Sequence, residues 1–183
     1  MKRDSAAEVR IVELKKTDDL PKLIYHYVTP SYYDLSVSRE SKFWKIMLIL
    51  KPFDKPIERR SESVFYEEFV EEPRPFAALL GDEQVGWLEL GYHKWNNRMR
   101  IWEILVKEEF RRRGIGTRLM EHAIRLAREK GARMLILETQ SCNVQAISFY
   151  LKQGFELIGF DSAAYSNEDV NKREIRLEMG LRL

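Results

Sequence analysis

The part of the chain best suited to chemistry is a run of arginines that leads into two closely spaced glycines. Residues 111–117 read Arg-Arg-Arg-Gly-Ile-Gly-Thr, and another arginine follows at position 118. Because glycine lacks a Cβ, backbone N–H groups here can converge on a diphosphate at the start of a helix, where the helix dipole favours negative charge. The residues predicted to bind this anion are Arg111, Arg112, Arg113, Gly114, Ile115, Gly116, Thr117 and Arg118.

The spacing distinguishes this stretch from two familiar phosphate-binding loops. A P-loop needs a longer glycine spacing followed by Gly-Lys-Ser/Thr, and a dinucleotide fingerprint needs a third glycine or alanine where this chain has Leu119. A flexible apolar arm on the diphosphate could run along the preceding strand and bond to the backbone of Ile104, Leu105 and Val106. Coenzyme A has this shape. An isolated Gly-x-Gly beside arginines is equally compatible with a solvated surface loop.

The elements that must position this loop are clearest from residue 76 onward. We predict three antiparallel strands, then a helix whose apolar stripe includes Leu119 and Ala123 and which Gly131 ends. Asn143 can cap a second helix that Gly154 closes. The predicted order is β-β-β-α-β-α-β-β, with strands at 76–80, 85–92, 100–106, 134–137, 155–160 and 175–183 and helices at 114–130 and 143–153.

The amino-terminal third is harder to interpret. Residues 9–14 predict a strand, and residues 17–27 a helix capped by Thr17 or Asp18. Residues 28–56 are compatible with either strand or loop. The mixture of charged and apolar residues over 57–72 predicts an exposed helix that Pro73 stops.

Length and composition indicate a single compact domain. The chain has 183 residues, of which 44% are hydrophobic and 33% charged, and a net charge of +2 gives no general attraction to nucleic acid or anionic membranes. A single cysteine, Cys142, excludes an intrachain disulfide, and the three histidines show no metal-ligand spacing with it. No signal-peptide pattern or long apolar run is present. We therefore expect a cytoplasmic protein without a metal.

At this point the chain resembles the GNAT superfamily of N-acetyltransferases. The family's phosphate motif, Arg/Gln-x-x-Gly-x-Gly/Ala after a strand, is filled by Arg111, Gly114 and Gly116. A second motif matches about thirty residues later, at Asn143, Ala146, Phe149, Tyr150, Gly154 and Phe155. Within the superfamily the chain is most similar to streptothricin acetyltransferases, through residues 94–96, 137–140, 159–161 and 165–167. The resemblance covers roughly residues 76–183.

This resemblance implies a fold and a reaction. The fold would be α/β (α+β), with a mixed central sheet of about six to seven strands flanked by helices. One domain over residues 1–183 would comprise a variable acceptor-side portion, residues 1–75, and an acetyl-CoA-binding portion, residues 76–183. The reaction would be direct acetyl transfer from acetyl-CoA to an amine. The protein would be a monomer or homodimer with neither nucleic acid nor membrane as partner.

The resemblance also assigns roles to individual residues. Tyr150 would protonate the CoA sulfur, although it could simply pack beside Phe149. Glu103, on the central strand, could take the amine proton or hold a cationic acceptor, or be an ordinary exposed carboxylate, with Trp102 and Ile104 on the opposite face. A backbone N–H near Val106 would polarise the thioester carbonyl. Asn143 could cap its helix or reach the pantetheine arm.

The acceptor is the least constrained part of the prediction. Aromatic and acidic residues of the first half could form a cleft for a cationic amine, or could be core and a solvated helix face: Tyr32, Tyr33, Phe43, Trp44, Glu67, Glu68, Glu71 and Glu72. A small cationic amine, including an antibiotic such as streptothricin, is the first candidate. A protein amino terminus, a lysine and a polyamine are alternatives, and so is a non-catalytic acyl-CoA-binding sensor. A nucleic-acid binder lacks a recognition helix here.

Overall fold

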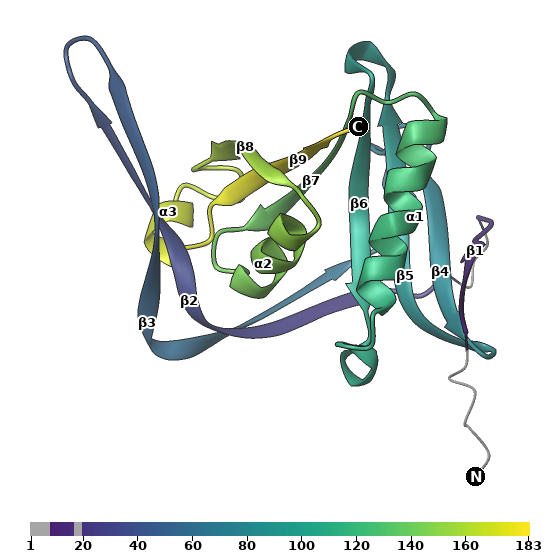
Figure 1. The fold of residues 1–183 in the computed structure, drawn as a ribbon. Helices are drawn as coiled ribbons and strands as arrows, with labels where there is room; N and C mark the ends of the chain where they lie inside the picture. The colour runs from purple at the N-terminus through teal and green to yellow at the C-terminus, as the bar shows by residue number, and fades with distance from the viewer. Residues whose placement is uncertain (1–7, 17–19) are drawn as a thin grey trace. The chain divides into compact units, whose positions relative to one another are not determined.

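The computed structural model describes residues 8–16 and 20–183, and it contains a seven-stranded mixed sheet flanked by helices (Figure 1). The order in the sheet is β1-β4-β5-β6-β7-β9-β8, and β2 and β3 form a separate two-stranded sheet. The strands are β1 (Val9–Glu13), β2 (Leu23–Arg39), β3 (Trp44–Ser63), β4 (Arg74–Leu80), β5 (Glu83–His93), β6 (Arg98–Val106), β7 (Met134–Gln140), β8 (Glu156–Asp161) and β9 (Arg176–Arg182). The helices are α1 (Ile115–Glu129), α2 (Val144–Lys152) and α3 (Asp169–Lys172), with short 3-10 turns η1 (Lys94–Asn96) and η2 (Glu108–Phe110). This confirms the predicted fold class.

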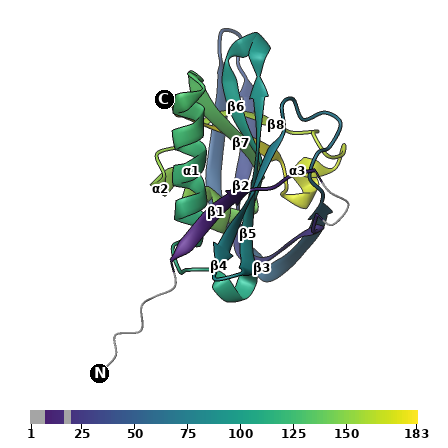
Figure 2. The ribbon, with the colours of Figure 1, turned by 90° about the vertical axis from the view of Figure 1, so that its right-hand side faces the viewer.

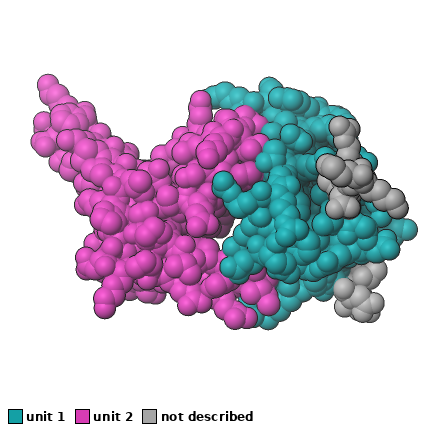
Figure 3. Space-filling view, turned by 60° about the horizontal axis from the view of Figure 1, so that its bottom comes forward, with its two compact units in different colours: residues 1–23, 62–136, 182–183 teal, residues 24–61, 137–181 magenta. Residues whose placement is uncertain are grey.

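The chain divides into two compact units, shown in different colours in Figure 3. Unit 1 comprises residues 1–23, 62–136 and 182–183, and unit 2 comprises residues 24–61 and 137–181. Strand β7 contributes to both, because the division falls after Ile136. The prediction of a single domain with a change of role after residue 75 stays a prediction.

Unit 1 is built on the antiparallel strands β1, β4, β5 and β6, with α1 along one face (Figure 2). Strand β5 is buried along most of its length. Its Gly86 lies beside the side chains of Ile115 and Leu119, so even-numbered residues of β5 near this point face α1. The buried stripe of α1 contains the predicted Leu119 and Ala123, and its other members are Ile115, Met120, Leu126 and Ala127.

Unit 2 contains the rest of β7, the strand β8, the helices α2 and α3, and most of β9 and of the hairpin β2–β3. Its core includes the fully or almost fully buried Leu137, Ile147, Phe155, Ile175 and Met179. The middle of the hairpin contacts the rest of unit 2. The Tyr33 N–H donates to the Ser141 carbonyl at 2.9 Å, and Arg173 pairs with Asp34 at 3.2 Å. Its tip, around residues 39–46, is exposed.

Two helix predictions in the amino-terminal third are wrong. The helix predicted for 17–27 lies partly outside the described residues, and from Leu23 onward the chain is strand β2. This segment is rich in aromatic and β-branched residues, which favour strands. The helix predicted for 57–72 is replaced by the end of β3 and a segment of turns, in which Tyr66 and Glu72 have positive φ that a right-handed helix does not permit.

From residue 76 the predicted order is confirmed, and the short helix α3 and the 3-10 turns η1 and η2 are added to it. Boundaries shift by a few residues, most at β7, which continues to Gln140. The ambiguous residues 28–56 are mostly strand, on both arms of the hairpin. No helix in the described part of the chain is long and apolar enough to cross a membrane.

Candidate active site

The predicted anion-binding loop lies between β6 and α1 in unit 1. Gly114 precedes the helix with a φ of 80°, and Arg112 also has a positive φ, 64°. The first helical bond runs from the Arg118 N–H to the Gly114 carbonyl at 3.1 Å, and no side chain of the described residues caps the helix. The N–H groups of residues 115–117 therefore point out of the helix without intrahelical acceptors, at its positive end.

The arginines of the loop lie close to this helix end. Arg112 and Arg113 are exposed, and the Arg113 guanidinium lies 5.1 Å from the centre of the Phe110 ring. The Arg111 Nε donates to the Val106 carbonyl at 3.3 Å, which ties the loop to the end of β6. A Cβ on Gly114 would meet nothing within 4 Å, so backbone conformation rather than packing explains the glycine there. The arrangement combines donors, dipole and charge suited to a diphosphate.

Strand β6 carries a β-bulge beside Glu103. In the pairing with β5, Glu103 lies opposite Glu89 and Ile101 opposite Leu90, so Trp102 is an extra residue on β6. The predicted simple alternation, with Trp102 on the face opposite Glu103, is wrong for this reason. The Trp102 Nε1 would be 2.5 Å from a Cβ on Gly91, and odd-numbered residues of β5 point away from α1. The indole therefore lies on the same face as Glu89.

The end of β6 is where the pantetheine arm is predicted to bind. Ile104, Leu105 and Val106 pair with β5 through Leu88, Trp87 and Gly86. The parallel pairing between β6 and β7 covers residues 98–100 of β6 and 134–136 of β7. Because alternate residues of a strand direct their N–H and C=O groups to opposite sides, part of the backbone over residues 104–106 points away from β5.

Glu103 and Glu89 lie on the face of unit 1 opposite α1, under the segment of residues 64–72. The Ser63 hydroxyl donates to Glu103 Oε1 at 2.5 Å, and the Tyr66 N–H donates to Glu89 Oε1 at 2.9 Å. Glu89 is only 1% exposed, and this burial raises its pKa to about 7, with the charges of Glu103 and Glu67 adding to the effect. Glu89 is not among the site residues predicted from the sequence. The available signal was a lone glutamate in the apolar run Val-Gly-Trp-Leu-Glu-Leu.

Two further predicted site residues, Asn143 and Tyr150, lie in unit 2. The Asn143 Oδ1 accepts the Ala146 N–H at 3.2 Å, which confirms the predicted helix cap. Tyr150 is 8% exposed, and its ring lies edge-on to Phe149 with centres 5.6 Å apart. The structure thus groups residues 103–118 in unit 1, and places Asn143 and Tyr150 on α2 and its cap in unit 2.

Comparisons with known proteins agree with this geometry. Residues 41–155 match the model of the acetyltransferase (GNAT) family. The chain belongs to the GNAT acetyltransferase family. It is 42% identical over 93 residues to a streptothricin acetyltransferase of Streptomyces lavendulae, a match that covers 50% of this chain and 49% of the relative's length.

Solved structures extend the likeness to nearly the whole chain. A nourseothricin acetyltransferase has 29% identity and a TM-score of 0.74, covering 95% of this chain and 98% of its own. A candidate streptothricin acetyltransferase from Bacillus anthracis str. Ames, solved in complex with acetyl coenzyme A, has 28% identity and a TM-score of 0.73, covering 98% and 99%. GNAT acetyltransferases use acetyl-CoA.

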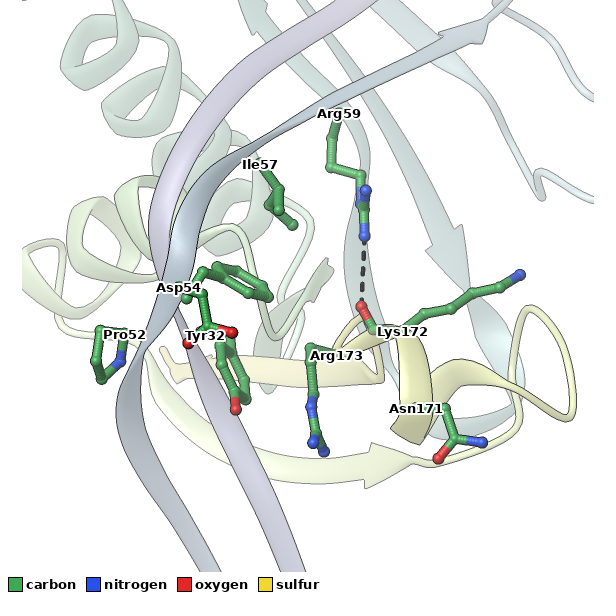
Figure 4. Close-up of a pocket in the computed structure, with 9 residues that line it drawn as sticks. Tyr32, Pro52, Asp54, Ile57, Arg59, Asn171, Lys172 and Arg173 are labelled. Carbon is green, nitrogen blue, oxygen red and sulfur yellow. Dashed lines mark hydrogen bonds between the residues drawn. The ribbon is translucent and has the colours of Figure 1, made fainter.

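In this GNAT protein the predicted acceptor residues are divided between the two units, the aromatic ones in unit 2 and the glutamates in unit 1. Tyr32 is buried in unit 2, with its ring 4.5 Å from that of Phe53 and 5.4 Å from the Arg173 guanidinium. These three residues line a cavity of about 360 Å³ between the hairpin and the end of α3 (Figure 4). Tyr33 is half-buried in β2, whereas Phe43 and Trp44 are exposed near the hairpin tip. The four predicted glutamates belong to unit 1.

The glutamates also differ among themselves. Glu72 is engaged by two lysines, Lys94 at 2.6 Å and Lys130 at 3.1 Å, so its charge is already balanced. Glu68 and Glu71 are exposed, and Glu67 is half-buried. Three aromatic rings cluster near the bulge of β6. The Trp102 ring centre lies 5.1 Å from that of Phe69 and 5.9 Å from that of His93. Phe69 is 64% exposed, so it offers an aromatic surface in the unit that carries Glu103.

Cys142 has the features of a structural thiol. It is fully buried, and burial raises its pKa. The Tyr27 hydroxyl donates to Gln140 Oε1 at 2.7 Å and lies 3.3 Å from the Cys142 Sγ. Among residues 8–16 and 20–183, no three His, Cys, Asp or Glu side chains are grouped as they would be around a metal ion.

Proposed function

We propose that this protein transfers an acetyl group from acetyl-CoA directly to a primary amine of a small cationic substrate, with an antibiotic of the streptothricin type as the first candidate. The observation that carries the proposal is the start of α1, where the N–H groups of residues 115–117 and the arginines of residues 111–113 can hold a pyrophosphate. Acetyl-CoA supplies the acetyl group as an activated thioester.

Each remaining residue has a task in this reaction. The backbone of residues 104–106 on β6 would bond the pantetheine arm, and an N–H near Val106 would polarise the thioester carbonyl. Glu103 would accept a proton from the amine. The Tyr150 phenol would donate a proton to the departing sulfur. Asn143 uses its Oδ1 as a helix cap, which leaves its Nδ2 as a donor for the pantetheine arm.

The acceptor proposal rests on two kinds of support. Relatives named streptothricin or nourseothricin acetyltransferase match the chain, one of them over 95% of its length. In unit 1, carboxylates and the exposed Phe69 beside Trp102 provide charge and aromatic faces, which attract cationic amines. A protein amino terminus, a lysine and a polyamine are the competing acceptors. A panel of these amines, assayed by thiol release from acetyl-CoA, separates them.

Binding of acetyl-CoA is tested by Thr117→Glu. A carboxylate in the first turn favours the helix itself but repels a pyrophosphate at the same N–H groups. We expect the Kd for acetyl-CoA, measured by calorimetry, to rise about tenfold or more, as expected for a like charge near the site. Tm should stay equal or rise slightly. Thr117→Gln, of similar size but uncharged, is the matched control and should keep much of the affinity.

Two results would overturn the proposed function. Equal affinity of Thr117→Glu and Thr117→Gln would mean that the start of α1 does not hold the pyrophosphate. Tight binding of acetyl-CoA without thiol release for any amine would instead assign the protein as a non-catalytic acyl-CoA sensor.

A further inference from the structure

Glu89 is a carboxylic acid at the centre of the sheet in unit 1. It is fully buried on β5, where its neighbours Leu88 and Leu90 are fully buried apolar residues. Its Oε1 accepts the N–H of Tyr66, a residue with a φ of 61° in the segment that covers this face. Burying a carboxylate in such surroundings is costly, and one N–H donor offsets only part of that cost.

Glu103, the predicted base, lies directly opposite Glu89 on the neighbouring strand β6. Antiparallel pairing of β5 with β6 puts Glu89 opposite Glu103, so both side chains leave the same face of the sheet. The Cβ atoms of directly opposed residues are about 4.5–5.5 Å apart. Each carboxylate has a separate donor, since Ser63 serves Glu103 and Tyr66 serves Glu89. The two acids are therefore close enough to influence each other, and each is held in place.

We propose that Glu89 is a positioning residue that makes Glu103 a stronger base, so that the two carboxylates accept the proton of the substrate amine as a coupled pair. This inference rests on the proposed acetyl transfer and deepens it. The N–H bond of the ammonium group breaks, its electron pair stays on nitrogen, and the proton binds to a Glu103 oxygen. The charge of the pair changes from −2 to −1, and the proton later passes to water.

The physical reason is repulsion between like charges. An ionised Glu89 disfavours ionisation of Glu103, which raises the affinity of Glu103 for a proton. Burial raises the pKa of Glu89 to about 7, so the pair loses its last proton near neutral pH rather than near pH 4.5. The pair is a competent base above that pH, and below it one proton is already bound.

Other charged groups on this face act on the pair as well. Glu67, in the covering segment, adds to the negative charge that raises the pKa of Glu89. The Tyr66 phenol, whose own pKa is raised by burial first and by Glu89 second, stays neutral in this range. Arg100, opposite Gly91 on β6, is buried and lies 4.6 Å from the Trp102 ring. Arg100 is thus a cation on the face that carries Glu89 and Glu103.

The decisive variant is Glu89→Gln. The amide oxygen of glutamine still accepts the Tyr66 N–H, but the side chain no longer titrates. We expect the acidic limb of the pH profile of kcat/KM, near pH 7 in the wild type, to move down by about one unit or more. Because Glu103 becomes a weaker base, kcat on the plateau should fall about tenfold. The Kd for acetyl-CoA should not change. Glu121→Gln, at an exposed carboxylate on α1, is the matched control and should keep the wild-type profile.

A direct measurement does not depend on turnover. With ¹³C-labelled glutamate side chains, NMR should show Glu89 titrating near pH 7 in the wild type and about one unit lower in Glu103→Gln, because the opposing charge is gone. If Glu89 has only a structural role, Glu89→Gln will keep the wild-type pH profile. That profile, or a Glu89 titration unaffected by Glu103→Gln, would overturn the inference. If the wild type releases no thiol with any amine, acetyl transfer fails, and the NMR titrations still decide whether the two acids are coupled.

Discussion

The middle of β5 and the tip of the β2–β3 hairpin both carry large apolar side chains, but their surroundings are opposite. On β5, Leu88 and Leu90 are fully buried, with α1 on one face and residues 64–72 on the other. At the hairpin tip, Phe43 is 58% and Trp44 63% exposed. Apolar side chains stabilise a fold only in proportion to the surface they remove from water. Large apolar side chains therefore contribute very differently to stability in the two regions.

The largest effect is expected for Leu119→Ala on α1, which tests the buried side of this contrast. Leu119 is fully buried and lies beside Gly86 of β5, so the substitution leaves a cavity in a closely packed layer. We expect the free energy of unfolding to fall by about 2–5 kcal/mol. Urea denaturation followed by circular dichroism measures it. A loss below about 1 kcal/mol would show that this layer is not tightly packed and would remove the contrast.

A second test uses pH and bears on the one buried acid of β5. The pKa of Glu89 is about 7 in the folded protein, against 4.5 ordinarily, so the folded state holds this proton more tightly than the unfolded state does. The stabilisation that comes from binding this proton is complete below about pH 4.5 and is lost as the pH rises through 7. The wild type should therefore lose up to about 3 kcal/mol relative to Glu89→Gln between these limits. Chemical denaturation of both proteins at several pH values checks this, and parallel stability curves would contradict it.

The smallest expected effect is at the hairpin tip, with Phe43→Ser. Because the side chain is already exposed, its removal should change the free energy of unfolding by less than about 0.5 kcal/mol. Urea denaturation at low protein concentration is the appropriate measurement, with Leu119→Ala as the reference. A loss above about 2 kcal/mol would mean that the tip is covered in solution, and sedimentation of the two proteins would then reveal whether a second copy covers it.

Prediction from sequence succeeded where short-range signals agree with one another. The apolar stripe of α1, the cap at Asn143 and the closing Gly154 specify their helices locally, and the structure confirms them. The loop over residues 111–117 was likewise recognisable, because donors, glycines and arginines are contiguous in the chain. Residues 57–72 were predicted as a helix because their local pattern is mixed. Their conformation depends instead on pairing with β2 and on the contact of Tyr66 with Glu89.

The sequence alone was enough for the order of elements from residue 76 and for membership of the family, whereas anion binding by residues 111–117 stays a prediction. These features depend on neighbours a few residues apart. Three features are apparent only in the tertiary structure: Trp102 is an extra, bulged residue, residues 23–63 form a hairpin, and Glu89 lies opposite Glu103. Strand register and burial join residues far apart in the chain, and local propensity carries no information about which distant partner a strand will choose.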